Sequence, residues 1–129
     1  MMEQKIADLS QKLVKAQRQD PIKESEPEYR SFCEGLPALL RSAGLAQTLA
    51  YLRAKDSGPH RIVYGHLQEH FRNLKMLEEK EDLSELVIDS ARMPMPKYRL
   101  YSRLALEIAH WHHRMVQALL RGRKEAAKP

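Results

Sequence analysis

The chain has 129 residues, the length of one domain, and carries 22 Lys plus Arg against 17 Asp plus Glu, a formal net charge of +5. Apolar residues make up 43% of it, which is enough for a core and excludes wholesale disorder. The lone Cys33 excludes an intrachain disulfide and a cysteine-rich zinc site. No run approaches the ~20 apolar residues of a membrane span, and the start lacks a signal-peptide pattern. We therefore expect a single cytoplasmic domain over residues 1–129 with no membrane contact.

The first half of the chain predicts three helices. Apolar residues at helical spacing predict a helix that starts near the N-terminus and ends at Asp20-Pro21. The sequence Ser25-Glu26-Pro27-Glu28 has the order of a helix start, and the helix that follows should kink or restart at Pro37. Gly44 is expected to end it with a positive φ, before a third helix over 45–55. In that helix, polar Gln47 or Thr48 should bond to a neighbouring helix or subunit.

The second half begins with the turn at residues 56–59. A helix should follow it, because apolar residues repeat at helical spacing from Val63 to Leu77. Leu83, Leu86 and Val87 predict a short helix, and the Met93–Pro96 segment should break the chain before a long final helix over 97–121. Residues 122–129 are expected to form a frayed basic tail. The fold class is all-α, a compact bundle of about five to six helices with a long C-terminal basic amphipathic helix.

The basic excess lies entirely at the C-terminal end. Residues 1–91 contain 13 basic and 15 acidic side chains, whereas residues 92–129 contain 9 basic and 2 acidic ones. Such asymmetry indicates a polyanionic partner for that end. The segment from Glu78 to Asp89 is acidic and is interpreted either as a solvated surface or as a docking patch for a basic partner.

The final helix separates into two faces. Tyr98, Tyr101 and Trp111 lie on the apolar face, where we expect them to be core. The opposite face carries a row of basic residues that extends over roughly 33 Å from Arg99 to Arg121. Guanidinium groups at that spacing suit a phosphate backbone, although a solvated polar face is an open alternative. The candidate RNA-binding residues are Arg99, Arg103, His110, Arg114, Arg121, Arg123 and Lys124.

The histidines suggest metal chemistry only weakly. His66, Glu69 and His70 fit the H-x-x-E-H pattern of inverted zinc peptidases, but five residues with two free positions match by chance easily. A surface or half-buried histidine pair is the preferred interpretation. His112 points to the apolar face and is expected to be a core residue. We predict no catalytic residues, no metal and no cofactor.

Two motifs give the chain a resemblance to a known family. The first is Gly-Leu-Pro-Ala-Leu-Leu at residues 35–40, followed by Ser-Ala-Gly-Leu-Ala-Gln-Thr-Leu-Ala-Tyr-Leu at 42–52 and then Lys55. The second lies in the final helix and comprises Tyr98, Arg99, Leu104, Glu107, Ala109, Trp111 and Arg114. Together they resemble the small helical subunit of type III-B CRISPR RNA-targeting effector complexes, the Cmr or RAMP-module complexes. The resemblance spans most of residues 26–120; His113 departs from the lysine of many relatives, and Met93–Pro96 has no match.

The resemblance implies a non-enzymatic subunit in antiviral defence. Copies would stack beside the backbone subunits that hold the guide RNA, support the target RNA and touch the large subunit at one end. The isolated chain is expected to be monomeric. The candidate subunit-interface residues lie at the helix junction and in the acidic segment; they are Arg41, Gly44, Gln47, Lys55, Glu78, Glu79, Glu81 and Asp82.

Other functions remain open from the sequence. A helical protein–protein adaptor without a nucleic-acid role would use the acidic segment and the Gly44 junction. A small zinc enzyme would use His66, Glu69 and His70. The acidic segment and the basic helix could also pair between copies of the chain.

Overall fold

The computed structural model describes residues 2–18 and 26–121, and every regular element within them is helical. The six α-helices of these residues are α1 (Met2–Arg18), α2 (Glu26–Ala43), α3 (Leu45–Lys55), α4 (Gly58–Asn73), α5 (Leu83–Ile88) and α6 (Met95–Val116), and a π-helical segment, Gln117–Arg121, continues α6. This confirms the predicted all-α bundle with a long last helix. Among the described residues, no helix combines the length and the apolar character that crossing a bilayer requires. The predicted tail, 122–129, lies outside them.

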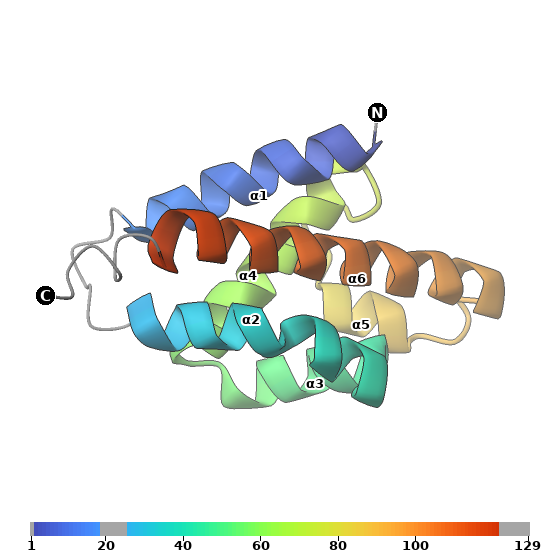
Figure 1. The fold of residues 1–129 in the computed structure, drawn as a ribbon. Coiled ribbons are helices and arrows are strands. Elements are labelled where there is room, and N and C mark those ends of the chain that lie inside the picture. Colours follow the sequence, from blue (N-terminus) through green and yellow to red (C-terminus); the bar gives the residue numbers. More distant parts are fainter. Residues whose placement is uncertain (1, 19–25, 122–129) are drawn as a thin grey trace, which may run out of the picture.

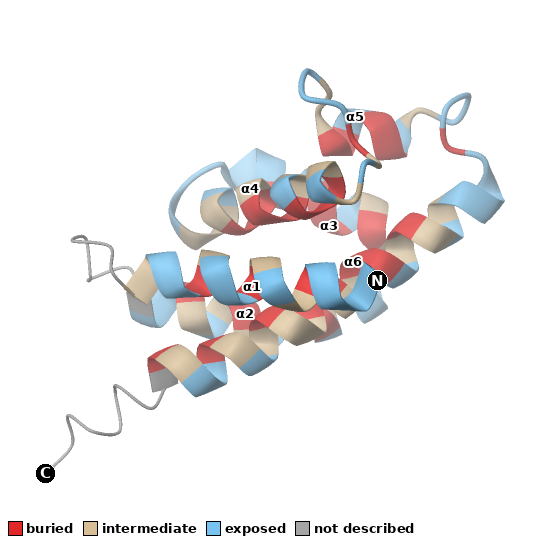
Figure 2. Ribbon diagram, turned by 90° about the horizontal axis from the view of Figure 1, so that it is seen from above, coloured by how far each residue is buried: buried red, intermediate tan, exposed pale blue. Residues whose placement is uncertain are grey.

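The long helix α6 organises the bundle. It lies between α1 and α2, and α4 crosses the bundle behind them (Figure 1). Helix α3 follows α2 directly and packs on α4 and α5. The outer side of α1 is largely exposed, while its buried positions Ile6, Ser10 and Val14 face the bundle (Figure 2).

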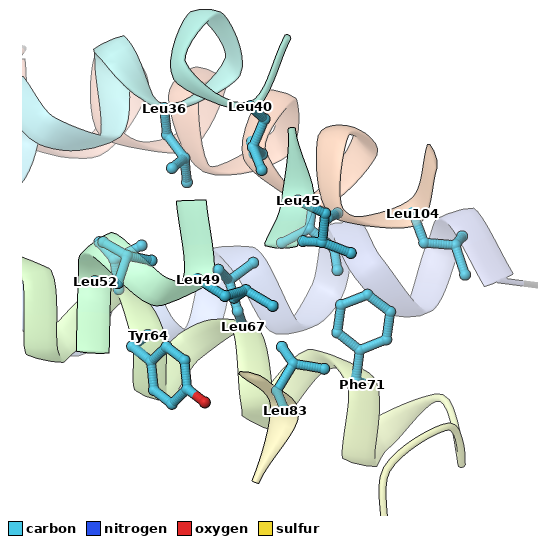
Figure 3. Close-up of a cluster of buried hydrophobic side chains, with 14 of the residues drawn as sticks. Leu36, Leu40, Leu45, Leu49, Leu52, Tyr64, Leu67, Phe71, Leu83 and Leu104 are labelled. Atoms are coloured by element: carbon cyan, nitrogen blue, oxygen red, sulfur yellow. The ribbon is translucent and has the colours of Figure 1, made fainter. Parts of the chain in front are cut away.

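Leucines from five helices fill the core. Leu36 and Leu40 of α2 point toward Leu45 and Leu49 of α3, and α4, α5 and α6 close the cluster (Figure 3). Each side chain of this size contributes about 1.5–3 kcal/mol when it is fully buried. The ring of Phe71 stacks on a ring of α6, that of Tyr101, with 5.0 Å between the centroids. These contacts anchor α6, so its remaining side is free to carry charge.

Helix α2 continues through Pro37 to Ala43, so the restart of the helix predicted at Pro37 is wrong. A proline inside a helix removes one hydrogen bond, at a cost of about 3 kcal/mol or more. Here Pro37 is buried, with the buried Leu36 on one side and Leu40 one turn later. Packing of this apolar turn into the core offsets the lost bond.

The junction of α2 and α3 is fixed from α6. Gly44 has φ +86°, which confirms the predicted positive φ, and any other residue would be strained there. The Tyr98 hydroxyl accepts a hydrogen bond from the Ala46 N–H at 3.1 Å and so satisfies a donor in the first turn of α3. Gln47 is exposed, while Thr48 is fully buried and its hydroxyl has no partner within the described residues. The hydrogen bond predicted for Thr48 is therefore not formed within this part of the chain.

Helix α6 begins earlier and ends earlier as a regular α-helix than predicted. It starts at Met95 rather than at residue 97, because Pro96 occupies the first turn, where a missing N–H costs nothing. The regular α-helix ends at Val116, and the last predicted turn, 117–121, is π-helical. The predicted break at Met93–Pro96 is confirmed for Met93 and Pro94, whereas Met95 and Pro96 already belong to α6.

Candidate functional site

The exposed side of α6 carries the predicted row of arginines. Arg99, Arg103 and Arg114 are exposed and His110 is half-buried, while the opposite side of the helix, including Leu104 and Ile108, is buried. Helix α6 lies between α1 and α2 (Figure 1), and Arg103 lines one hollow with Glu3 of α1 and another with Arg41 of α2. No ion pair connects Arg99 or Arg103 to an acid anywhere in the described ranges. These guanidinium groups are therefore available to an external anion.

Arg41 joins this row from the last turn of α2. Its guanidinium lies 3.3 Å from Nε2 of His110, although the two residues are 69 positions apart in the sequence. Burial and then the positive charges of Arg41, Arg114 and His113 lower the pKa of His110. His110 is therefore a neutral hydrogen-bonding group at pH 7, not a cation. We call the surface formed by Arg41, Arg99, Arg103, His110 and Arg114 the basic face.

Two hollows border the basic face, with Arg103 and Leu106 between them. The one toward α2, about 330 Å³, is lined by Arg41, Gly44, Tyr98 and Ser102 with their neighbours. The other, toward α1, has a volume of about 290 Å³. We call it the Trp111 hollow; its lining residues are Glu3 of α1 and Arg103, Leu106, Glu107, His110, Trp111 and Arg114 of α6. The basic face is thus flanked by two pockets, each large enough for a small molecule.

Trp111 is not the core residue that the apolar stripe predicts. The ring is half-buried and lines the hollow, and the Arg114 guanidinium lies 4.8 Å from the centroid of the ring. A guanidinium in this position is attracted by the ring quadrupole. Of the other two aromatic residues on that stripe, Tyr101 is buried as predicted and Tyr98 is half-buried.

The C-terminal members of the predicted row do not contribute to the described surface. Arg121 ends the π-helical segment, and its side chain is not among those described. Arg123 and Lys124 lie outside the described residues. The basic face as described therefore consists of Arg41 of α2 and of α6 residues between Arg99 and Arg114.

The acidic segment is partly consumed by internal contacts. Asp82 caps α5 through the Glu85 N–H, accepts hydrogen bonds from Tyr64 and Ser84, and lies 3.5 Å from Arg53. The pKa of Asp82 is lowered, since these hydrogen bonds and Arg53 outweigh the opposing effect of burial. Glu81 pairs with a second arginine, Arg92. Glu78 and Glu79 are the exposed members of this candidate interface.

The remaining interface candidates lie around α3. Gly44 and Gln47 occupy its start, whereas Lys55 ends it. Gln47 and Lys55 are exposed. Arg41, which the sequence grouped with them, lies instead in the basic face next to His110. Only the fold could show this, because the contact joins two helices across the bundle.

The zinc pattern does not assemble into a site. His66 and His70 are buried, at 9% and 1% exposed, and not at the surface or half-buried as predicted; Glu69 is exposed. No group of three potential ligands capable of holding a metal exists among the described residues. Cys33 is also buried, which raises the pKa of its thiol to about 12 and leaves no thiolate at neutral pH.

The buried histidines instead form a polar cluster inside the bundle. His112, a core residue as predicted, lies with its Nε2 2.8 Å from Nε2 of His70. Ser10 of α1 approaches the same His70 nitrogen at 3.4 Å, and the Tyr29 hydroxyl of α2 lies 3.3 Å from Nδ1 of His66. We call His66, His70 and His112 the histidine cluster. It connects α1, α2, α4 and α6.

Comparisons with known proteins agree with the resemblance seen in the sequence. The family described as CRISPR-associated protein (Cas_Cmr5) matches residues 2–119. The CRISPR system Cmr subunit Cmr5 of Thermus thermophilus is 30% identical over 113 residues, which cover 86% of this chain and 91% of that protein. The crystal structure of a CRISPR-associated Cmr5 family protein from Thermus thermophilus superposes with a TM-score of 0.72 and 27% identity, covering 92% of this chain and 96% of that one. With its helical fold and these matches over nearly its whole length, the chain belongs to the CRISPR-associated Cmr5 family.

Proposed function

We propose that the chain is a non-catalytic subunit of a CRISPR Cmr effector complex whose basic face holds the phosphate backbone of RNA. Membership of the family supports the first part, because the curated relative is a Cmr subunit. The second part depends on one observation: three exposed arginines of α6 and Arg41 of α2 form a single surface. Guanidinium groups bind phosphate through paired hydrogen bonds.

The geometry favours backbone contact along α6. From Arg99 to Arg114 the helix rises by about 22 Å, so several phosphates of one strand can be reached. A rigid helix keeps these arginines in register, so ordering them on binding costs little entropy. Each isolated contact is weak, and assembly of several subunits on one strand would supply the affinity through avidity.

The test compares charge reversal within the basic face with the same charge reversal elsewhere on the surface. The double variant R103E/R114E should bind a labelled single-stranded oligoribonucleotide more weakly in fluorescence anisotropy. Two lost phosphate contacts should reduce the salt slope, d log K/d log[salt], by about 1.4 in magnitude, at about 0.7 for each contact to a single strand. Circular dichroism would confirm that the helices remain.

The matched control is R61E/K80E, which makes the same change in net charge at exposed positions on α4 and in the acidic segment. It should keep the wild-type slope. Equal slopes for both variants would contradict specific contact by the basic face. Failure of the wild-type chain to bind RNA at any salt concentration would favour the alternative, a protein–protein adaptor.

A further inference from the structure

We propose that the Trp111 hollow receives one unpaired base of the bound strand, stacked beside the indole, while the arginines at its rim hold the neighbouring phosphates. This inference rests on the proposed RNA contact of the basic face. It adds a subsite for a nucleobase to a surface that otherwise contacts only phosphate.

The walls of the hollow suit a flat, neutral ring. The indole of Trp111 and the side chain of Leu106 are apolar, and the Arg114 guanidinium lies over the indole at 4.8 Å from its centroid. Bases of single strands stack on aromatic rings and on guanidinium planes. At about 290 Å³ the hollow is at the lower end of ligand-pocket volumes, which suits one ring system and not an extended chain segment.

The charges of the hollow separate base from phosphate. Glu107 of α6 and Glu3 of α1 both line it, so a phosphate placed inside would meet two carboxylates. Arg103 and Arg114 line the same hollow and belong to the exposed row that continues beyond it. A strand that follows the arginines therefore keeps its phosphates at the rim and can turn one base inward.

The carboxylates also predict a base preference. Glutamate accepts hydrogen bonds, as from the exocyclic amino group of cytosine, and cannot donate them when ionised. Cytosine, adenine and guanine carry such an amino group, whereas uracil has none, and its single N3–H lies between two carbonyl oxygens that the carboxylates would repel. Glu3 and Glu107 should therefore favour these bases over uracil.

The fluorescence of the wild-type chain tests the proposal directly, because Trp111 is its only tryptophan. The probes are end-labelled ten-nucleotide strands of oligocytidylate, oligouridylate and an abasic ribose-phosphate backbone, at low salt. Anisotropy of the label reports binding, and emission of Trp111 reports stacking. We expect oligocytidylate to quench the emission by half or more, oligouridylate to quench it less, and the abasic strand to bind without quenching.

Different outcomes separate the two proposals. Binding of oligocytidylate without any change in Trp111 emission, or equal quenching by the abasic strand, would overturn the base subsite and leave the phosphate contact standing. Equal quenching by the two base-bearing strands would overturn the assigned base preference. The absence of binding by every strand would overturn the proposed function and this inference with it.

A substitution series gives a second measurement. W111L should weaken oligocytidylate binding by about five- to 150-fold, the range measured for loss of one stacked base, while W111F retains a ring and should recover most of the affinity. The control Y51L removes another exposed aromatic ring, on α3, and should bind normally. Wild-type affinity in W111L would contradict the proposal. If W111L loses its helical circular dichroism signal, the quenching experiment on the unchanged chain decides.

Discussion

Lowering the pH from 7.5 to 5 is expected to reduce the free energy of unfolding by about 6 kcal/mol, because the native bundle holds three histidines neutral. Burial lowers the pKa of His66 to about 4 and that of His70 to about 3, and in His70 the charge of His66 adds to the effect. The pKa of His112 is lowered well below 6.5 by burial and by its two neighbours in the histidine cluster.

The sign follows from where the protons bind. In the unfolded chain each histidine has a pKa near 6.5 and takes up a proton below that pH, whereas the native rings stay neutral. The unfolded state therefore gains stability as the pH falls. At pH 5, about 1.5 pH units below the unfolded pKa, protonation of each ring in the unfolded chain lowers the free energy of unfolding by about 2 kcal/mol. This follows from about 1.4 kcal/mol for each pH unit. The total for the histidine cluster approaches the whole stability of a small domain, about 5–15 kcal/mol.

Other groups act outside this window or only slightly within it. Asp82, whose pKa is lowered from 3.8, affects stability only below about pH 4. His60 and His110 also have lowered pKa values, but these rings are partly exposed and solvent screens them. The hydrogen bond between His70 and His112 reinforces the effect, because two protonated rings would face each other as donors.

The assay is urea unfolding followed by circular dichroism at pH steps between 7.5 and 5. The free energy of unfolding should fall by about 4 kcal/mol per pH unit near pH 5.5, where all three unfolded rings are protonated. In H66Q, whose amide can still bond to Tyr29, this slope should drop by about one third whatever the starting stability. A total loss below about 2 kcal/mol by pH 5, the share of one ring, would refute the reasoning.

Three substitutions test local features by the midpoint of urea unfolding. T48V should stabilise the protein by about 1 kcal/mol, because it removes a buried hydroxyl without a partner among the described residues; destabilisation would show that the hydroxyl is satisfied. D82A should lower the free energy of unfolding by about 2 kcal/mol or more, since it removes the cap of α5 and the acceptor of the Tyr64 hydroxyl. A decrease of less than about 0.5 kcal/mol would exclude this role of Asp82. G44A should lower the free energy of unfolding by about 1–3 kcal/mol, because φ +86° with ψ 165° is a conformation that essentially only glycine adopts, whereas G35A, inside α2 where an added Cβ has open space, should be neutral or stabilising.

Local signals in the sequence predict most of the fold. Helical spacing identifies every helix of the described residues, including the six-residue α5, and Gly44 marks a true change of φ. Pro37 misleads because the cost of a proline is local, whereas the burial that offsets it comes from the whole bundle. The fold class can thus be predicted from the sequence, whereas the ends of individual helices depend on how the helices pack.

The candidate site is harder to predict from the sequence than the fold, for three reasons. His66 and His70 follow Val63 by three and seven residues, so the spacing that marks the buried side of α4 also includes them, although the same two residues match a metal motif that predicts exposure. Trp111 stands at the edge of the apolar stripe next to Arg114, where an angle on a helical wheel does not decide exposure. The approach of Arg41 to His110 depends on how α2 packs against α6, which no local pattern encodes.

The central position of α6 has a consequence for synthesis of the protein. This helix is synthesised after α1 to α5, yet it contacts α1, α2, α3 and α4. At about 5–20 residues per second, the 22 residues of α6 take about 1–4 s to be added, and until then α1 and α2 lack the helix against which they pack. The apolar sides of the first helices must remain exposed or be shielded by other proteins until α6 has left the ribosome. The bundle therefore cannot close before α6 has been synthesised, and a chain truncated before Met95 would expose the sides that α6 covers and would be a substrate for proteases.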